Sequence, residues 1–214
     1  MNRWDALTAV CAHLRAGLFG GEPPCGRRRI SWERLVEASS RHYVTTALAW
    51  CLKDWAEVPA DARDYFATVL ALNAERNEVL YRALKRIVAA CNGIGIDPIP
   101  LKGAACLVEG TYPSRSLRFL GDLDLLIPAE RSTDAFAALK EIGFDIKADD
   151  VPTPLDHHHL PPLHDSKAGG GVELHTKLTL PDALAVVPTD WFAAGTHLSS
   201  VRLFSGRSSP SKRS

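Results

Sequence analysis

Two aspartates stand two residues apart at the start of an apolar segment, in the run GDLDLLI at residues 121–127. If this run is a β-strand, Asp122 and Asp124 share one face with Cα atoms roughly 7 Å apart, and apolar side chains occupy the other face. Two carboxylates at this spacing can jointly hold a hard divalent cation such as Mg²⁺, which keeps coordination positions for phosphate oxygens. The pair therefore predicts phosphoryl or nucleotidyl transfer, although D-x-D is also common in turns and helix N-caps.

A later segment, VELHTKL at residues 172–178, supplies a third carboxylate. Its alternation predicts a strand with one apolar and one polar face, and the polar face carries Glu173, His175 and Lys177. Glu173 is thus a candidate to complete a metal site with the two aspartates. His175 orients a carboxylate, contacts a nucleotide or is a structural histidine, and the sequence leaves these three interpretations open.

Small and cationic residues precede the aspartates. The pair Lys102-Gly103 predicts a glycine turn that starts a short apolar helix, and Arg118 and Gly121 lie just ahead of Asp122. Arginine is suited to bidentate contacts with phosphate, and lysine acts on it as a point charge. The alternatives are a surface position for Lys102 and a salt bridge to an aspartate for Arg118.

The candidate residues belong to three short motifs. In chain order these are LKG at residues 101–103, R-x-x-G-D-x-D at 118–124 and E-L-H at 173–175. In this order the chain resembles the nucleotidyltransferase superfamily of the DNA polymerase beta type, and within it a bacterial branch known broadly as nucleotidyltransferase family proteins. The resemblance covers about residues 99–178. It implies an α+β fold in which a small mixed or antiparallel sheet has an N-terminal helical region packed on it.

The resemblance also implies an enzyme that moves a nucleoside monophosphate from a nucleoside triphosphate to a hydroxyl acceptor, which is RNA, a protein or a small molecule. Two Mg²⁺ ions would stabilise the developing negative charge. The catalytic and metal-binding residues would be three carboxylates, Asp122, Asp124 and Glu173, with Glu173 also accepting the proton of the attacking hydroxyl. The residues that would bind the nucleotide are Lys102, Gly103, Ala104, Arg118, Gly121 and His175.

Two other functions stay open. Ala104 replaces a residue that can carry a hydroxyl in related chains, so phosphate binding at the helix start would rest on Lys102 and backbone N–H groups. This departure, and the end of the chain at Ser214 where related chains continue with further helices, allow a catalytically inactive interaction module. A toxin-like nucleotidyltransferase acting on tRNA is the other alternative, because such toxins share the K-G turn and an arginine before D-x-D.

A histidine-rich segment suggests zinc as a rival metal. Two prolines interrupt this segment and it lacks the H-E-x-x-H pattern of a helical zinc site. The sequence therefore favours the carboxylate site over zinc. The histidines concerned are His157, His158, His159, His164 and His175.

Composition narrows the classes of function. The 214 residues carry 25 Lys and Arg against 25 Asp and Glu, so no global basic field draws the chain to nucleic acid. The five cysteines form no C-x-x-C pair, which is typical of small buried side chains in a reducing compartment. The sequence contains neither a signal peptide nor an apolar run long enough to span a membrane. We therefore expect a cytoplasmic protein without a membrane partner.

The elements that must position the candidate residues follow from periodicity and turn residues. Helices are predicted at residues 4–18, from Ser31 as N-cap to about residue 55, and after Pro59 to about Gly93. Strands are predicted at residues 96–101, 122–127 and 144–146, with a helix at 130–142 and an antiparallel pair that includes the Glu173 strand. The predicted domains are a helical region at 1–95, a catalytic domain at 96–198 and a disordered tail at 199–214.

Overall fold

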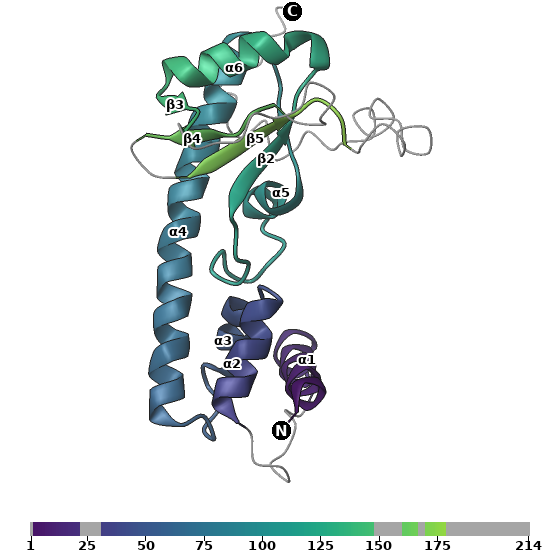
Figure 1. The fold of residues 1–214 in the computed structure, drawn as a ribbon, viewed down its shortest axis with the longest axis vertical. Helices are drawn as coiled ribbons and strands as arrows, with labels where there is room; N and C mark the ends of the chain where they lie inside the picture. Colours follow the sequence, from purple (N-terminus) through teal and green to yellow (C-terminus); the bar gives the residue numbers. More distant parts are fainter. Residues whose placement is uncertain (1, 22–30, 148–159, 167–169, 179–214) are drawn as a thin grey trace, which may run out of the picture. The chain divides into compact units, whose positions relative to one another are not determined.

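The structure is a computed structural model that describes residues 2–21, 31–147, 160–166 and 170–178 (Figure 1). Its contacts divide the chain into two compact units. The helical unit comprises Met1–Glu78 and Tyr112–Phe119, and the sheet unit comprises Val79–Thr111 and Leu120–Ser214. The domain limits expected from the sequence stay predictions, and the tail at 199–214 lies outside the described residues.

The described residues of the helical unit form three helices and the first part of a fourth. They are α1 (Arg3–Phe19), α2 (Trp32–Arg41), α3 (Thr45–Leu52) and α4 (Ala60–Gly93), of which the residues up to Glu78 belong here. Asn2 and Asp5 form a capping box at the start of α1, and the Ser31 hydroxyl accepts a hydrogen bond from the Arg34 N–H at the start of α2. These starts confirm the helix predicted at residues 4–18 and Ser31 as the N-cap of the next helix.

The single helix expected from Ser31 to about residue 55 is wrong, because the chain turns between α2 and α3. Tyr43 adopts a φ of +56°, in the left-handed region that ends helices, and its N–H donates to the Ser40 carbonyl. The Ser39 and Ser40 hydroxyls each lie within hydrogen-bond distance of the Thr45 hydroxyl. Local side-chain hydrogen bonds of this kind compete with helix continuation.

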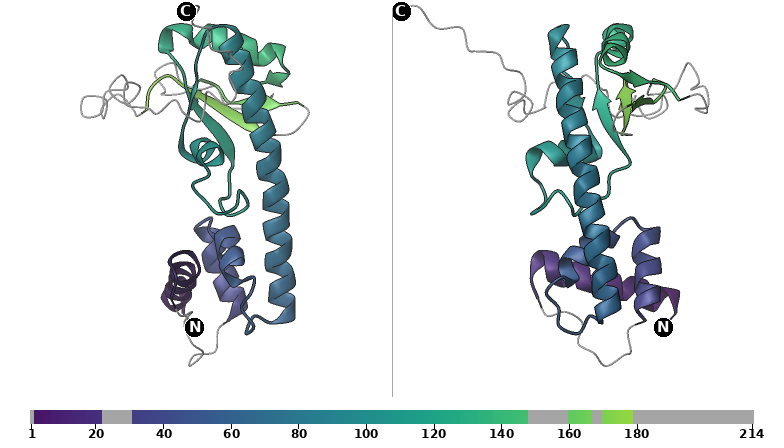
Figure 2. Two further views of the ribbon diagram at one scale, coloured as in Figure 1. Left: turned by 180° about the vertical axis from the view of Figure 1, so that it is seen from behind. Right: turned by 90° about the vertical axis from the view of Figure 1, so that its left-hand side faces the viewer.

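The sheet unit is built on a mixed five-stranded sheet with the strand order β1-β2-β5-β4-β3. The outer pairs are antiparallel, whereas β2 and β5 are parallel neighbours, and all views in Figures 1 and 2 draw them side by side. The strands are β1 (Ile99–Pro100), β2 (Asp122–Leu126), β3 (Phe144–Asp145), β4 (Leu163–Asp165) and β5 (Gly171–His175). The α+β class and the mixed sheet expected from the sequence are confirmed.

Each predicted strand is present but contains fewer residues than expected. β1 pairs over two residues instead of six, because Pro98 and Pro100 have no N–H to donate to a sheet ladder. The antiparallel pairing expected for the Glu173 strand occurs between β4 and β5. The helix expected at 130–142 is a short 3-10 turn (Ala129–Arg131) followed by α6 (Ser132–Glu141).

One face of the sheet is apolar and packs on helices. Buried side chains from the C-terminal part of α4, from α5 (Lys102–Glu109) and from α6 form one core cluster with alternate residues of β2 and β5. An apolar stripe along α4 belongs to this cluster, with Leu80, Leu84, Ile87, Val88 and Cys91 all buried. Because side chains alternate along a strand, the opposite face of β2 and β5 carries the acidic residues. None of the described helices is both long and apolar enough to span a bilayer.

Candidate metal and nucleotide site

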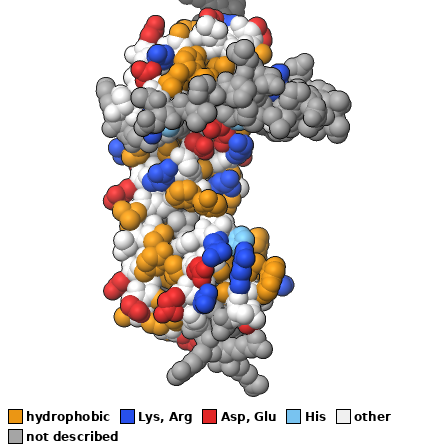
Figure 3. Space-filling view, viewed as in Figure 1, with side chains coloured by type: hydrophobic (Ala, Val, Ile, Leu, Met, Phe, Trp, Pro, Cys, Tyr) orange, Lys and Arg blue, Asp and Glu red, His pale blue; other side chains and the backbone are white. Residues whose placement is uncertain are grey.

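The parallel pairing of β2 and β5 brings two carboxylates together. In its register Asp124 is the direct partner of Glu173, and Asp122 is the partner of Gly171. Strand alternation therefore places Asp122, Asp124 and Glu173 on one face, as the sequence predicts. The space-filling view shows acidic side chains gathered over β2 and β5, with basic side chains beside them (Figure 3).

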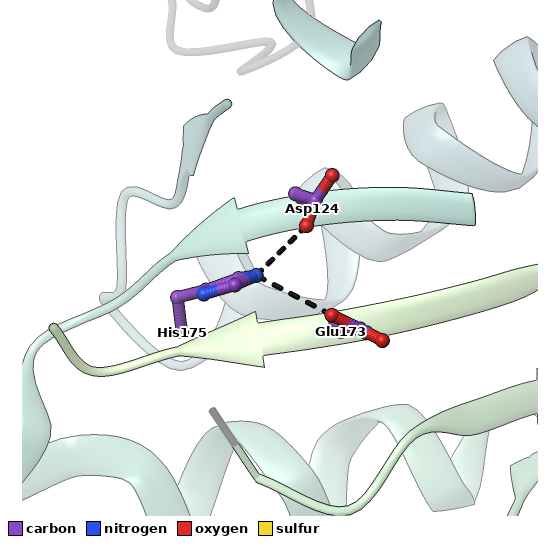
Figure 4. Close-up of side chains that lie close together, drawn as sticks. All are labelled: Asp124, Glu173 and His175. Carbon is purple, nitrogen blue, oxygen red and sulfur yellow. Dashed lines mark hydrogen bonds and ion pairs between the residues drawn. The ribbon is translucent and has the colours of Figure 1, made fainter. Parts of the chain in front are cut away.

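His175 lies on the same face and points its ring toward both carboxylates (Figure 4). Its Nε2 is 2.8 Å from Asp124 Oδ1 and 3.6 Å from Glu173 Oε2. One donor atom from each of Asp124, Glu173 and His175 lies within 4.8 Å of the other two, which makes this the group of described residues that could hold a metal ion. Of the interpretations left open for His175, the structure thus shows contact with a carboxylate.

Asp122 is a neighbour of this group and not a member of it. It begins β2 two residues before Asp124, and its strand partner Gly171 has no side chain to fill the space opposite. Burial raises the pKa of Asp122, and the negative charges of Asp124 and Glu173 raise it further. Asp122 is therefore close enough to the other carboxylates to be repelled by them, which is the arrangement that a bound cation relieves.

Lys102 supplies the positive charge at the site. Its Nζ lies 2.6 Å from Asp124 Oδ1, the same oxygen that His175 contacts. The Lys102 side chain is 60% exposed, whereas that of Asp124 is 6% exposed, so the ammonium reaches the buried carboxylate from the solvent side. Lys102 also adopts a φ of +46°, which is uncommon for a residue other than glycine. Backbone strain of this kind is found where the surrounding structure fixes a functional side chain.

The charges around Asp124 set the protonation states. Burial alone would raise the pKa of Asp124, but the hydrogen bonds from His175 and Lys102 outweigh it and hold the pKa below its usual value. Burial would likewise lower the pKa of Lys102, and the hydrogen bond to Asp124 with the nearby carboxylate charges raises it instead. At neutral pH the site therefore holds an ionised Asp124 beside a charged Lys102.

The start of α5 lies next to this cluster in the sequence. The N-cap residue is Leu101, whose side chain makes no hydrogen bond to the first turn. The backbone N–H groups of that turn can therefore donate hydrogen bonds to a bound anion. Gly103 and Ala104 are buried, and Ala104 is part of the core. A Cβ at Gly121 would have no described atom within 4 Å, so packing among the described residues does not require a glycine there. The nucleotide-binding roles of these residues stay predictions.

Arg118 belongs to the helical unit, where the loop 112–119 is fixed by side chains that the sequence analysis did not single out. The buried Asn73 and Asn77 amides both donate to the Arg118 carbonyl, at 3.1 and 2.8 Å. The buried Thr46 hydroxyl donates to the Leu117 carbonyl at 2.6 Å. The available signal was the i, i+4 spacing of two asparagines on the face of the amphipathic helix α4 that continues with Leu80 and Leu84. The contact predicted between Arg118 and a triphosphate stays a prediction.

The alternative zinc site falls mostly outside the described residues, which include neither His157, His158 nor His159. His164 lies on β4 opposite Gly171, and His175 is the one histidine of the metal-binding group. The described structure thus associates one histidine of that segment with the carboxylates.

Comparison with models of known families identifies the family of the chain. The model of a family described as uncharacterised nucleotidyltransferase matches residues 28–205. The chain belongs to this family. The matched range contains the LKG, R-x-x-G-D-x-D and E-L-H motifs, and with them the candidate catalytic and nucleotide-binding residues. No curated protein and no solved structure shows significant similarity to the chain.

Proposed function

We propose that this member of the nucleotidyltransferase family is a metal-dependent enzyme that transfers a nucleoside monophosphate from a nucleoside triphosphate to a hydroxyl acceptor. The observation that carries the proposal is the pairing of Asp124 with Glu173 on adjacent parallel strands, with Lys102 on the same carboxylate. The acceptor belongs to one of three classes: RNA, a protein or a small molecule.

The donor set fits a divalent cation. Asp124 and Glu173 offer carboxylate oxygens, Asp122 adds a third carboxylate on the same face, and the Lys102 ammonium offsets part of their charge. Mg²⁺ is the ion predicted from the aspartate pair. A divalent ion held here would supply the positive charge that stabilises the negative charge developing on the transferred phosphoryl group.

Lys102 has two positions in this proposal. In the free protein its ammonium stabilises the ionised Asp124, and its mostly exposed side chain can turn away when a cation takes that place. The ammonium then contacts oxygens of the triphosphate, beside the N–H groups of the first turn of α5. Arg118 is proposed to make a further contact with the triphosphate.

Glu173 is the proposed general base. Its side chain is 25% exposed, more than that of Asp124 at 6%, so the acceptor hydroxyl can reach it from solvent. Accepting the hydroxyl proton makes the oxygen a better nucleophile for attack on the α-phosphorus, and pyrophosphate leaves.

The test is incubation of the protein with each α-labelled nucleoside triphosphate, a divalent ion and a cell extract, followed by separation of RNA, protein and small molecules. We expect label in one fraction with the native chain and none with the Asp124→Asn variant. A folded native protein that binds no triphosphate and labels no fraction would contradict the proposal and favour the interaction module.

A further inference from the structure

The metal-binding group contains a nitrogen donor. Enzymes that hold Mg²⁺ between carboxylates present oxygen atoms to it, whereas here one of the three grouped donors is the imidazole Nε2 of His175. Mg²⁺ prefers oxygen, and imidazole is a ligand typical of transition-metal ions. The identity of the third donor therefore bears on which ion the site selects.

We propose that His175 coordinates the metal through Nε2, together with Asp124 and Glu173, and that the site selects a first-row transition-metal ion such as Mn²⁺ over Mg²⁺. This inference rests on the metal site of the proposed function. It assigns His175 a role as a metal ligand, which differs from the nucleotide-binding role expected from the sequence.

The separations between the donor atoms support shared coordination. Two ligands at about 2.1 Å from one ion and at right angles to each other lie about 3.0 Å apart. Nε2 of His175 is 2.8 Å from Asp124 Oδ1 and 3.6 Å from Glu173 Oε2, which brackets that value. The three donors lie within 4.8 Å of one another, so rotation of the carboxylate side chains would bring them onto one ion.

Burial and direction support the same assignment. The His175 side chain is 2% exposed, and it is the Nε2 edge of the ring that faces the two carboxylates (Figure 4). The Lys102 ammonium already lies 2.6 Å from the oxygen that Nε2 contacts, so this point of the site accommodates a cation. Coordination through Nε2 uses the tautomer of neutral imidazole that carries its proton on Nδ1.

The test measures binding of Mn²⁺ and Mg²⁺ to the full chain without nucleotide. Electron paramagnetic resonance detects free Mn²⁺ directly, and Mg²⁺ is titrated as a competitor. We expect tighter binding of Mn²⁺ and, in pulsed spectra, a hyperfine coupling from one directly bound ¹⁴N. Equal affinity for the two ions, or a bound Mn²⁺ without nitrogen coupling, would overturn the inference.

His175→Gln separates coordination from hydrogen bonding. Its amide can still donate to Asp124 but is a poor ligand, so we expect the nitrogen coupling to vanish and Mn²⁺ affinity to fall by about tenfold or more, with Mg²⁺ affinity little changed. His42→Gln, at an exposed position of the helical unit, is the matched control and should change neither. Unchanged Mn²⁺ affinity in folded His175→Gln would show that His175 only orients Asp124.

These outcomes are distinct from failure of the proposed function. If His175 is no ligand but Asp124→Asn still abolishes metal binding and transfer, the enzyme stands and the metal selectivity proposed here falls. If Mn²⁺ and Mg²⁺ both fail to bind the native chain even with triphosphate present, both proposals fail.

Discussion

Two buried aspartates lie on opposite faces of the same sheet. Asp165 is on the apolar face, where its fully buried carboxylate pairs with Arg86 of α4 at 2.6 Å. Asp124 is on the polar face, where its carboxylate pairs with Lys102 at the same distance. Burial and ion pairing are therefore alike at the two positions, and neither distinguishes a structural carboxylate from a functional one.

The difference lies in the balance of charge around each pair. Arg86 also donates to the Ile142 carbonyl, so its planar guanidinium ties α4 to the segment that leads into β3. At Asp124 the Lys102 ammonium is under the charge of three carboxylates, because Asp122 and Glu173 act on it together with Asp124. A site that keeps an excess of negative charge and a cation on an exposed side chain is suited to exchange that cation for another.

The largest effect is expected from Asp124→Asn compared with Asp165→Asn. Asp124→Asn removes a proposed metal ligand, so transfer should fall by about 10³-fold while the protein stays folded. Asp165→Asn should lower the melting temperature but leave transfer per folded molecule unchanged. Transfer assays and thermal melts on both variants make the test. An equal loss of transfer in Asp124→Asn and Asp165→Asn would contradict the assignment of the active site to the polar face.

Arg86→Ala tests the structural pair from its other side. The substitution removes the guanidinium that pairs with the buried Asp165 carboxylate. We expect the free energy of unfolding to fall by about 3 kcal/mol. This value is at the low end of the losses measured for broken buried ion pairs, because the Arg86 side chain is partly exposed. Denaturant unfolding measures this. Lys102→Met, the counterpart on the polar face, should cost less stability and raise KM for the triphosphate. A larger stability loss for Lys102→Met than for Arg86→Ala would reverse the comparison.

Glu173→Gln sharpens the division of roles within the polar face. The amide keeps the shape of the side chain but cannot accept the proton of the acceptor, so kcat should fall by about 10²-fold. The KM for the triphosphate should change less, since Lys102 and the start of α5 remain. Steady-state kinetics separate the two parameters. A rise in KM with unchanged kcat would assign Glu173 to binding alone.

The smallest effect concerns Asp122 and pH. The pKa of Asp122 is higher in the folded protein than in the unfolded chain, so the ionised carboxylate destabilises the folded state at neutral pH. We therefore expect Asp122→Asn to stabilise the metal-free protein at neutral pH. The gain in melting temperature should shrink as pH falls through the folded pKa, because the native Asp122 then becomes neutral as well. Thermal melts from neutral to acidic pH check this. A variant that melts below the native protein at neutral pH would make Asp122 structural.

The sequence by itself determined the faces of the strands and the starts of the helices. Alternation in GDLDLLI and VELHTKL placed Asp122, Asp124, Glu173 and His175 on polar faces, because side-chain direction in a strand is a local property. Ser31 as an N-cap and the apolar stripe of α4 were equally local. The family resemblance rested on the same residues.

Only the tertiary structure decided which of these residues meet. Asp124 contacts His175 across 51 residues of sequence because β2 and β5 pair in parallel, in a register that aligns Asp124 with Glu173. A parallel register is not set by a short turn, so it depends on how the whole core packs. The same packing placed Asp165 on the apolar face against Arg86 and buried Asn73 and Asn77 under the Arg118 loop. Side-chain alternation is local and readable in sequence, whereas contacts between distant strands depend on the cooperative packing of the entire unit.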